Sequence, residues 1–280
     1  MKDIIIDTLI DTLKLVPFLF IAFLILELFE HKFSKKTIKV VEKSGKYGPI
    51  LGGLLGAIPQ CGFSVIATNL YVSRIITLGT LISIYLSTSD EMIPVLISQD
   101  ASISLILKIL LIKVLIGMFC GVIIDLVLRK KENLKKDYSL CEEEHCHCEN
   151  NIFLSSLKHT INIIIFILVI NFMLNLCFYY LGEDYISKIL LKDSIFGSFA
   201  SCLIGLIPNC GASVMLSQLY LGNAISFGSL IGGLLTGSGV SLLVLFKTNK
   251  DIKENLKIIF ILYSIGVLSG VLIELIGKVF

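Results

Sequence analysis

The sequence predicts an all-α polytopic membrane protein made of two inverted-topology repeats, each with three full spans and a re-entrant Pro-x-Cys-Gly helical hairpin. Three observations lead to this fold class: apolar residues occur in long blocks, one motif recurs at a fixed offset, and basic residues gather in loops. Of the 280 residues, 55% are hydrophobic and only 16% are charged. A soluble domain carries about 25% charged residues.

The apolar residues are concentrated in eight stretches. Several of them contain about 20 residues, the length that an α-helix needs to cross a hydrocarbon core. The first stretch has no small-residue cleavage site after it, so we interpret it as a span and not as a signal peptide. The stretches are 4–29, 50–72, 75–98, 103–128, 161–182, 195–221, 224–246 and 258–280.

One long polar interruption divides the chain. We expect a first membrane repeat at residues 1–128, a Cys/His-rich linker at 129–160 and a second membrane repeat at 161–280. The net charge of +2 gives no indication of nucleic-acid binding, because the basic residues lie between the apolar stretches. In that position they determine membrane topology.

The two repeats also share a sequence motif. The run GAIPQCGFSV at residues 56–65 recurs as GLIPNCGASV at residues 205–214, an offset of 149 residues. The register continues through Leu70-Tyr71 over Leu219-Tyr220 and Gly79 over Gly228. Chance explains matching leucines in such a chain, but it does not explain proline, cysteine, glycine and tyrosine in one register.

The basic loops predict which segments cross the membrane. Lysines and arginines cluster at 32–46, 129–136 and 247–257, and basic loops remain in the cytoplasm. Three apolar stretches separate each pair of consecutive loops. Because three is odd, one stretch of each set must enter and leave on the same face.

The stretches 50–72 and 195–221 are the best candidates for this re-entrant path. Proline removes a backbone donor and glycine loosens a helix, so Pro59–Gly62 is suited to a turn between two half-helices. Each leg of about ten residues rises roughly 15 Å, which is half of the hydrocarbon thickness. The two hairpins then enter from opposite faces and their tips approach near the midplane, as in many secondary transporters.

The hairpin tips carry the predicted substrate-binding residues. Thiolates suit soft ions such as Cu(I), Zn(II) or arsenic-like metalloids, and one cysteine from each repeat could share an ion. Amides precede the cysteines and hydroxyls follow them. The alternative is that each cysteine is a small residue that permits close helix packing. The predicted substrate-binding residues are Gln60, Cys61, Ser64, Asn209, Cys210 and Ser213.

An acidic pair lies inside the stretch 75–98. Asp90 and Glu91 would each cost about 2.5–3.5 kcal/mol if charged at the centre of a bilayer. They must therefore face a cavity, bind a cation or be protonated, and we assign them to ion coupling, with Lys113 able to neutralise one of them. The second repeat has Thr236–Gly239 there, without an acid. The alternative is a position at the membrane surface.

The central linker contains a metal-binding composition. Its thiols and imidazoles alternate within a few residues, in a spacing that fits a flexible capture segment and not a zinc finger. Three other cysteines, Cys120, Cys177 and Cys202, are interpreted as small buried apolar residues. The predicted metal ligands are Cys141, His145, Cys146, His147 and Cys148.

No catalytic motif is present in the sequence. It has no phosphate-binding loop, no Ser-His-Asp arrangement and no zinc-protease motif, so we expect no enzymatic activity and no permanently bound cofactor. The absence of a Cys-x-x-Cys pair also argues against a membrane thiol enzyme.

Several of these motifs together resemble one prokaryotic family. They are PQCGFS at 59–64, STSDEM at 87–92, HCHC at 145–148 and IPNC at 207–210. The family is that of the ten-transmembrane heavy-metal exporters, also called arsenic efflux proteins or manganese transporters, and the resemblance covers essentially the whole chain. It implies a metal or metalloid permease without naming the ion. Six full crossings and four half-helices agree with the family's ten.

The leading hypothesis is an ion-coupled exporter of a heavy-metal or metalloid ion. We expect a multi-pass protein of the plasma (inner) membrane with its central loop in the cytoplasm. Its expected partners are the lipid bilayer, the transported metal ion and coupling protons, with no nucleic acid and with homo-oligomerisation left open. The alternatives are a Mn(II)-type transporter with oxygen ligands and a permease for an organic anion or organo-metalloid.

Overall fold

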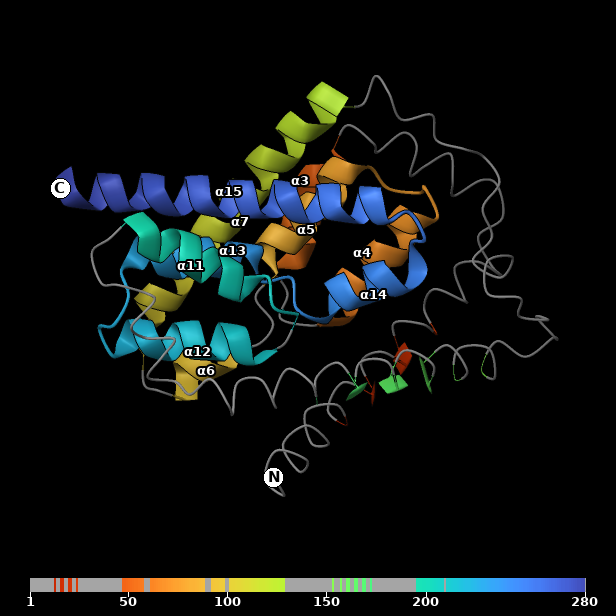
Figure 1. Ribbon diagram of the computed structural model, residues 1–280, viewed down its shortest axis with the longest axis horizontal. Helices are drawn as coiled ribbons and strands as arrows, with labels where there is room; N and C mark the ends of the chain where they lie inside the picture. The colour runs from red at the N-terminus through yellow and green to blue at the C-terminus, as the bar shows by residue number, and fades with distance from the viewer. Residues whose placement is uncertain are drawn as a thin grey trace.

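The chain folds into a bundle of α-helices in the computed structural model (Figure 1). The structure describes residues 47–57, 61–88, 92–98, 101–128, 195–208 and 210–279, with individual positions between 13 and 24 and between 153 and 172. Every regular element in these ranges is a helix. The expected spans 4–29 and 161–182 are represented only by such individual positions, and most of the linker 129–160 lies outside the described residues.

The helices of the two halves correspond to one another. The first half contains α3 (Gly48–Gly56), α4 (Cys61–Val72), α5 (Leu78–Ser87), α6 (Met92–Ser98) and α7 (Ile103–Leu128). The second contains α11 (Ile195–Gly205), α12 (Cys210–Leu221), α13 (Phe227–Thr236), α14 (Val240–Thr248) and α15 (Ile252–Val279). The bounds of α12 and α13 follow those of α4 and α5 at the offset of the sequence motif, so the helix pattern repeats with the sequence.

The predicted helix breaks at the Pro-x-Cys-Gly motifs are present. Helix α3 ends at Gly56 and α4 begins at Cys61, while α11 ends at Gly205 and α12 begins at Cys210. The stretches 75–98 and 224–246 are also broken: α5 ends at Ser87 before α6 begins at Met92, and α13 ends at Thr236 before α14 begins at Val240. The break in the first precedes Pro94, which lies in the first turn of α6, where proline is tolerated. In the second, Gly239 has a φ of +55°.

Helices α3 and α5 run side by side in the same direction. Gly48 lies against Thr80 near the beginning of both helices, and Gly56 lies against Ser87 near their ends. Helix α4 ends only a short turn before α5 begins. The first residue of α3 and the last residue of α4 therefore lie at the same end of the bundle.

Helix α7 packs along α5 in the opposite direction. Gly79 at the beginning of α5 meets Gly121 near the end of α7, and Gly117 lies against Ser83. Small residues at these crossings allow the two backbones to approach closely, as in membrane helix pairs. Helices α13 and α15 repeat this contact, with Gly228 against Gly270 and Gly232 against Gly266.

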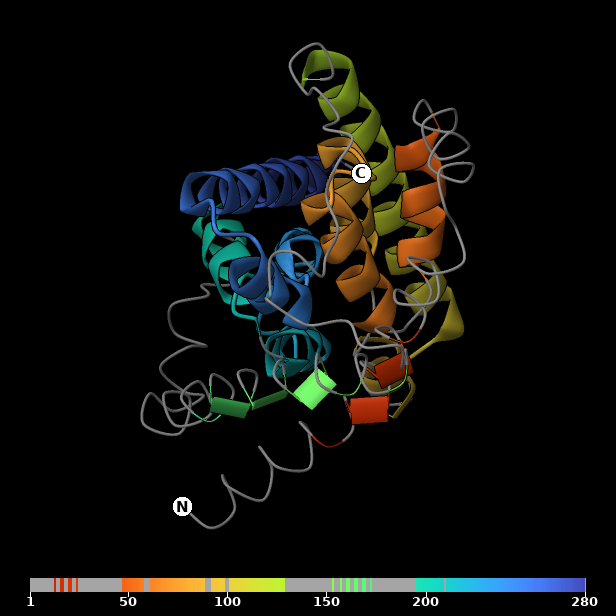
Figure 2. The same cartoon turned by 90° about the vertical axis from the view of Figure 1, so that its right-hand side faces the viewer.

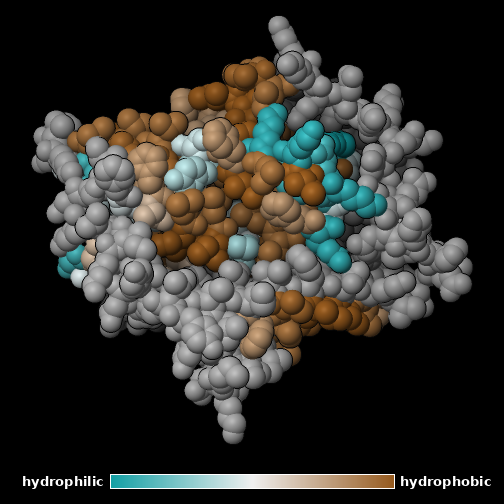
Figure 3. Space-filling model, in the orientation of Figure 1, coloured by the Kyte–Doolittle hydropathy of each residue, from teal (hydrophilic) through white to brown (hydrophobic). Residues whose placement is uncertain are grey.

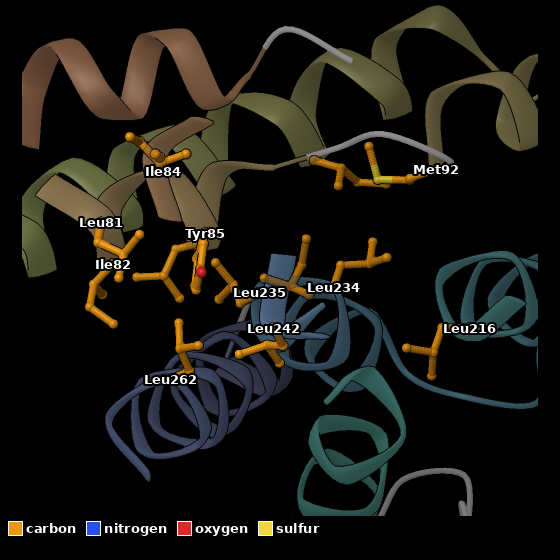
Figure 4. Packing of buried hydrophobic residues seen from close by; sticks show 14 of the residues in the cluster. Leu81, Ile82, Ile84, Tyr85, Met92, Leu216, Leu234, Leu235, Leu242 and Leu262 are labelled. Atoms are coloured by element: carbon orange, nitrogen blue, oxygen red, sulfur yellow. The ribbon is translucent and has the colours of Figure 1, made fainter. Parts of the chain in front are cut away.

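Each half packs one of its short helices against the other half. Figure 2 shows the helices of the first half, orange to yellow-green, largely on one side and those of the second half, teal to blue, on the other. Helix α4 packs against α14 of the second half, and its counterpart α12 packs against α6 of the first. The core lies at the junction: Leu81 and Tyr85 of α5 meet Leu235, Leu242 and Leu262 (Figure 4).

The outer surface is apolar along the two long helices. Leu107, Leu111, Leu115 and Phe119 of α7 are exposed, as are several large apolar residues of α15, and Figure 3 shows this hydrophobic surface in brown. Such a surface is suited to lipid and not to water. Three helical segments within the described ranges are long and apolar enough to cross a membrane: Ile103–Leu128, Phe227–Thr248 and Ile252–Gly277.

We expect the replacement of Gly121 by alanine to separate α5 from α7. A Cβ at Gly121 would lie 2.6 Å from the carbonyl oxygen of Gly79 and 2.8 Å from the Cβ of Ser83. Overpacking of this kind costs about 1–3 kcal/mol in the free energy of unfolding. Gly277→Ala is the control, because nothing lies within 4 Å of a Cβ there. Thermal unfolding of both purified variants in detergent measures the difference, and equal midpoints would contradict the predicted close contact.

Candidate functional site

A group of buried polar side chains lies where α4, α5 and α14 meet. We call it the polar cluster; its members are Ser64, Thr68, Asn69, Tyr85 and Ser241, all at most 1% exposed. The hydroxyls of Thr68 and Tyr85 are 2.7 Å apart, and Tyr85 donates to the carbonyl of Ser241 across 3.4 Å. The cluster therefore joins the first half to the second.

Asn69 is the least satisfied member of the polar cluster. Its side chain is fully buried, and neither its amide oxygen nor its amide nitrogen has a hydrogen-bond partner among the described residues. The hydroxyls of Ser238 and Ser241, beside the break between α13 and α14, are in the same condition. A buried polar group without a partner costs about 1–3 kcal/mol. Retaining such groups is typical of a place that binds a polar or ionic ligand.

The second half contains a counterpart of this arrangement. Ser217 of α12 is fully buried, and its hydroxyl donates to the carbonyl of Ser213 across 2.8 Å. In α4, the hydroxyl of Thr68 donates to the carbonyl of Ser64 across 2.7 Å. The two predicted serines thus occupy equivalent positions, one turn into α4 and α12. Ser64 is buried and Ser213 is half-buried.

The structure gives the backbone position of the predicted cysteines. Cys61 is the first residue of α4 and Cys210 is the first residue of α12, and their side chains are not among those described. Helix α4 packs chiefly against α14 and helix α12 against α6 and α13. Each cysteine-bearing helix therefore lies against a broken helix of the opposite half. The neighbouring Gln60 and Asn209 lie outside the described residues.

The acidic pair and the predicted metal ligands also lie outside the described residues. The nearest described residues on either side of Asp90 and Glu91 are buried, Thr88 at 5% and Met92 at 1% exposure. Within the described ranges, no group of three or more His, Cys, Asp or Glu side chains is placed to hold a metal ion. The loop ligands Cys141, His145, Cys146, His147 and Cys148 belong to the part that the structure does not describe.

Sequence analysis missed a buried carboxylate at the end of α7. Asp125 accepts hydrogen bonds from the backbone N–H of Gly79, at 2.9 Å, and from the Thr77 hydroxyl, at 2.6 Å. A carboxylate placed here complements the positive end of the α5 dipole. Glu274 lies at the equivalent position of α15 beside Gly228, so extending the motif register to the long helices would have revealed the pair.

An ion pair connects the end of α4 to the beginning of α15. Arg74, which has a φ of +58°, donates two hydrogen bonds to Glu254, at 2.6 and 2.8 Å. Tyr71 donates a third to the same carboxylate at 2.6 Å. These bonds to Glu254 raise the pKa of the Arg74 guanidinium above its ordinary value, so the arginine remains charged. Figure 3 shows hydrophilic residues gathered around the beginning of α15.

We expect Asn69→Leu to retain or increase thermal stability. The substitution removes an unsatisfied amide and keeps a similar volume, so the cost of about 1–3 kcal/mol is relieved. Thr68→Val is the control, because it removes a hydroxyl that bonds to Ser64 and lies beside Tyr85, and it should lose about 1 kcal/mol. Thermal unfolding of the purified variants compares them. A larger loss in Asn69→Leu than in Thr68→Val would show that the amide has a structural partner.

Comparison with known proteins identifies the family of the chain. One family model matches residues 1–177 and 173–279, and its description is "Putative, 10TM heavy-metal exporter". Neither the curated proteins nor the solved structures include a match. The helical fold and its apolar segments agree with a multi-pass membrane protein. Because the match extends over almost all of the sequence, the chain belongs to this family of ten-transmembrane heavy-metal exporters.

Proposed function

We propose that the protein is a secondary exporter that moves a heavy-metal or metalloid ion across the plasma membrane between two inverted repeats. Family membership supports the class of the transported ion. The polar cluster supports the proposed location of the transport path. It lies at the junction of the halves and contains the amide of Asn69, which has no partner among the described residues. A path between two rocking halves is the usual design of such transporters.

The re-entrant hairpin is part of this proposal. It is supported by the parallel course of α3 and α5 and by the short turn between α4 and α5. Together these place Gly48 and Val72 at one end of the bundle, as a chain that enters and leaves on the same face requires. The lengths of α3 and α4, 9 and 12 residues, correspond to roughly half of a bilayer crossing each.

The inverted relation of the repeats is supported by two contacts at the beginning of α5. Asp125 brings the end of α7 to this point, and Arg74, just before α5, holds the beginning of α15 through Glu254. Helix α7 therefore ends where α15 begins. Figure 1 shows α7 (yellow to green) crossing α15 (light to dark blue) obliquely, with α7 rising to the right and α15 running to the left.

In the proposed cycle, the Cys/His segment of the linker captures the ion in the cytoplasm. The thiolates of Cys61 and Cys210 then bind it as soft ligands, supported by Gln60, Ser64, Asn209 and Ser213. Asp90 and Glu91 couple its movement to protons. The burial of Thr88 and Met92 supports this role, because a carboxylate that lay between them inside the protein would need a cation or a proton.

A Mn(II)-type transporter with oxygen ligands is the second candidate. It is favoured by the amide oxygen of Asn69 and the hydroxyls of Ser238 and Ser241, which have no hydrogen-bond partner in the part of the chain that the structure describes. Hard divalent ions prefer oxygen ligands, whereas soft ions prefer thiolates. The two candidates therefore differ in whether transport depends on Asn69 or on the cysteines.

We expect Cys61→Ser and Cys210→Ser each to abolish transport of a soft ion in reconstituted vesicles. Serine keeps the volume but removes the soft ligand. The matched control is Cys120→Ser, because Cys120 is a half-buried residue of α7 and belongs to neither motif. Arsenite, Cd(II) and Mn(II) are tested in parallel. Unchanged arsenite and Cd(II) fluxes, together with loss of Mn(II) flux in Asn69→Leu, would replace the soft-ion proposal by the oxygen-ligand one.

We expect single cysteines at positions 47 and 74 to react with a membrane-impermeant reagent on the cytoplasmic face. A cysteine at position 223, the counterpart of position 74, should react from outside. Each is introduced into a variant whose own reactive cysteines are replaced, and labelling is compared in intact cells and in inverted vesicles. Positions 47 and 74 on opposite faces would refute the hairpin, and positions 74 and 223 on the same face would refute the inversion.

A further inference from the structure

One buried lysine lies between the two halves. Lys113 is near the middle of α7, and its side chain is only 1% exposed. Its ammonium group donates to the carbonyl oxygen of Thr88 and, at 2.8 Å, to the carbonyl oxygen of Leu234. Thr88 is the residue that ends α5, and Leu234 lies in the last turn of α13. The ammonium therefore connects the ends of two broken helices, one from each half.

The two carbonyl groups have the properties of a cation site. The last carbonyls of a helix lack intrahelical donors and carry partial negative charge. Helix α13 ends in this way, because the N–H of Ser238 turns to the carbonyl of Thr236 and not to that of Leu234. Where broken helices end inside a membrane protein, such carbonyls commonly coordinate a small cation.

The fold itself does not require a charge at this position. The residue of α15 that corresponds to Lys113 is Leu262, which is fully buried in the core. Around Lys113 the helix also contributes apolar residues, including the fully buried Ile109. Because removing a cation from water costs several kcal/mol, a lysine retained where leucine serves the other half indicates that the ammonium has a specific task.

We propose that the ends of α5 and α13 form a binding site for a hard monovalent cation and that the Lys113 ammonium fills this site as a tethered cation. The acceptor atoms that the structure describes there are carbonyl oxygens, which suit hard cations and not thiol-seeking metals. The site is therefore chemically separate from the proposed cysteine site for the transported ion. By neutralising both helix ends, Lys113 holds the halves together. Release of the Lys113 ammonium during alternating access rests on the proposed function. The presence of the ammonium in the site does not.

Chemical rescue of Lys113→Ala tests the proposal. The purified full-length variant is unfolded by heat in choline, sodium and methylammonium chloride at equal ionic strength. In choline its midpoint should fall by about 10 °C, since uncompensated polar groups remain buried. Methylammonium or sodium should restore about 4 °C at ten times its dissociation constant. Wild-type protein should show no difference between the salts, and an equal midpoint of the variant in all three salts would overturn the proposal.

Two further variants make the result specific. Leu262→Ala opens a comparable space at the equivalent position of α15 without exposing the two carbonyls, so its midpoint should not respond to small cations. Lys113→Met keeps the side-chain volume without the charge, and it decides the question if Lys113→Ala does not fold. If the unfolding midpoint of Lys113→Met lies well below that of the wild type while Lys113→Arg retains stability, the result supports a tethered cation. If the midpoint of Lys113→Met lies at or above the wild-type value, Lys113 contributes only packing, and the proposal fails. None of these measurements uses transport, so they remain independent of the proposed function.

Discussion

The constraint on which this fold depends is that a helix break inside a bilayer exposes backbone groups that no water can satisfy. In this protein, side chains of adjacent helices form hydrogen bonds with such backbone groups. The ammonium of Lys113 donates to the carbonyls of Thr88 and Leu234, at the ends of α5 and α13. At the beginning of α5, the side chain of Asp125 accepts a hydrogen bond from the N–H of Gly79, and that of Thr77 accepts one from the N–H of Thr80. Side chains of adjacent helices thus satisfy backbone groups at the ends of α5 and α13.

Close approach is what brings these partners within reach. Glycines line both faces along which α5 and α13 meet their neighbours, and a Cβ at most of them would overlap a neighbouring atom. Helix α5 lies between α3 and α7, and α13 lies between α11 and α15. The small residues therefore have two effects: they supply packing energy without a hydrophobic driving force, and they place hydroxyl and carboxylate groups at hydrogen-bonding distance from broken helix ends.

The sequence predicted the features that proline, apolar length and internal repetition encode. The breaks at Pro59 and Pro208 and the correspondence of the halves are of this kind. The break before Met92 could not be located, because a polar run does not itself end a helix. Asn69 was missed because a single amide in a helix carries no signal. Its lack of a partner arises only when α4 packs against α14.

The chemistry of the junction comes from differences between halves that share one helix pattern. At the equivalent positions of the second half, Tyr85 becomes Leu234, Lys113 becomes Leu262 and buried Asn69 becomes the exposed Gln218. The first half thus brings the amide of Asn69, the hydroxyl of Tyr85 and the ammonium of Lys113 to the junction. The second half brings backbone carbonyls, those of Ser241 and Leu234. A backbone carbonyl keeps its position whatever rotamer its own side chain adopts, so these two contacts between the halves do not depend on side chains of the second half. In the proposed transporter, one cysteine from each half binds the ion, and the halves move relative to one another at this junction.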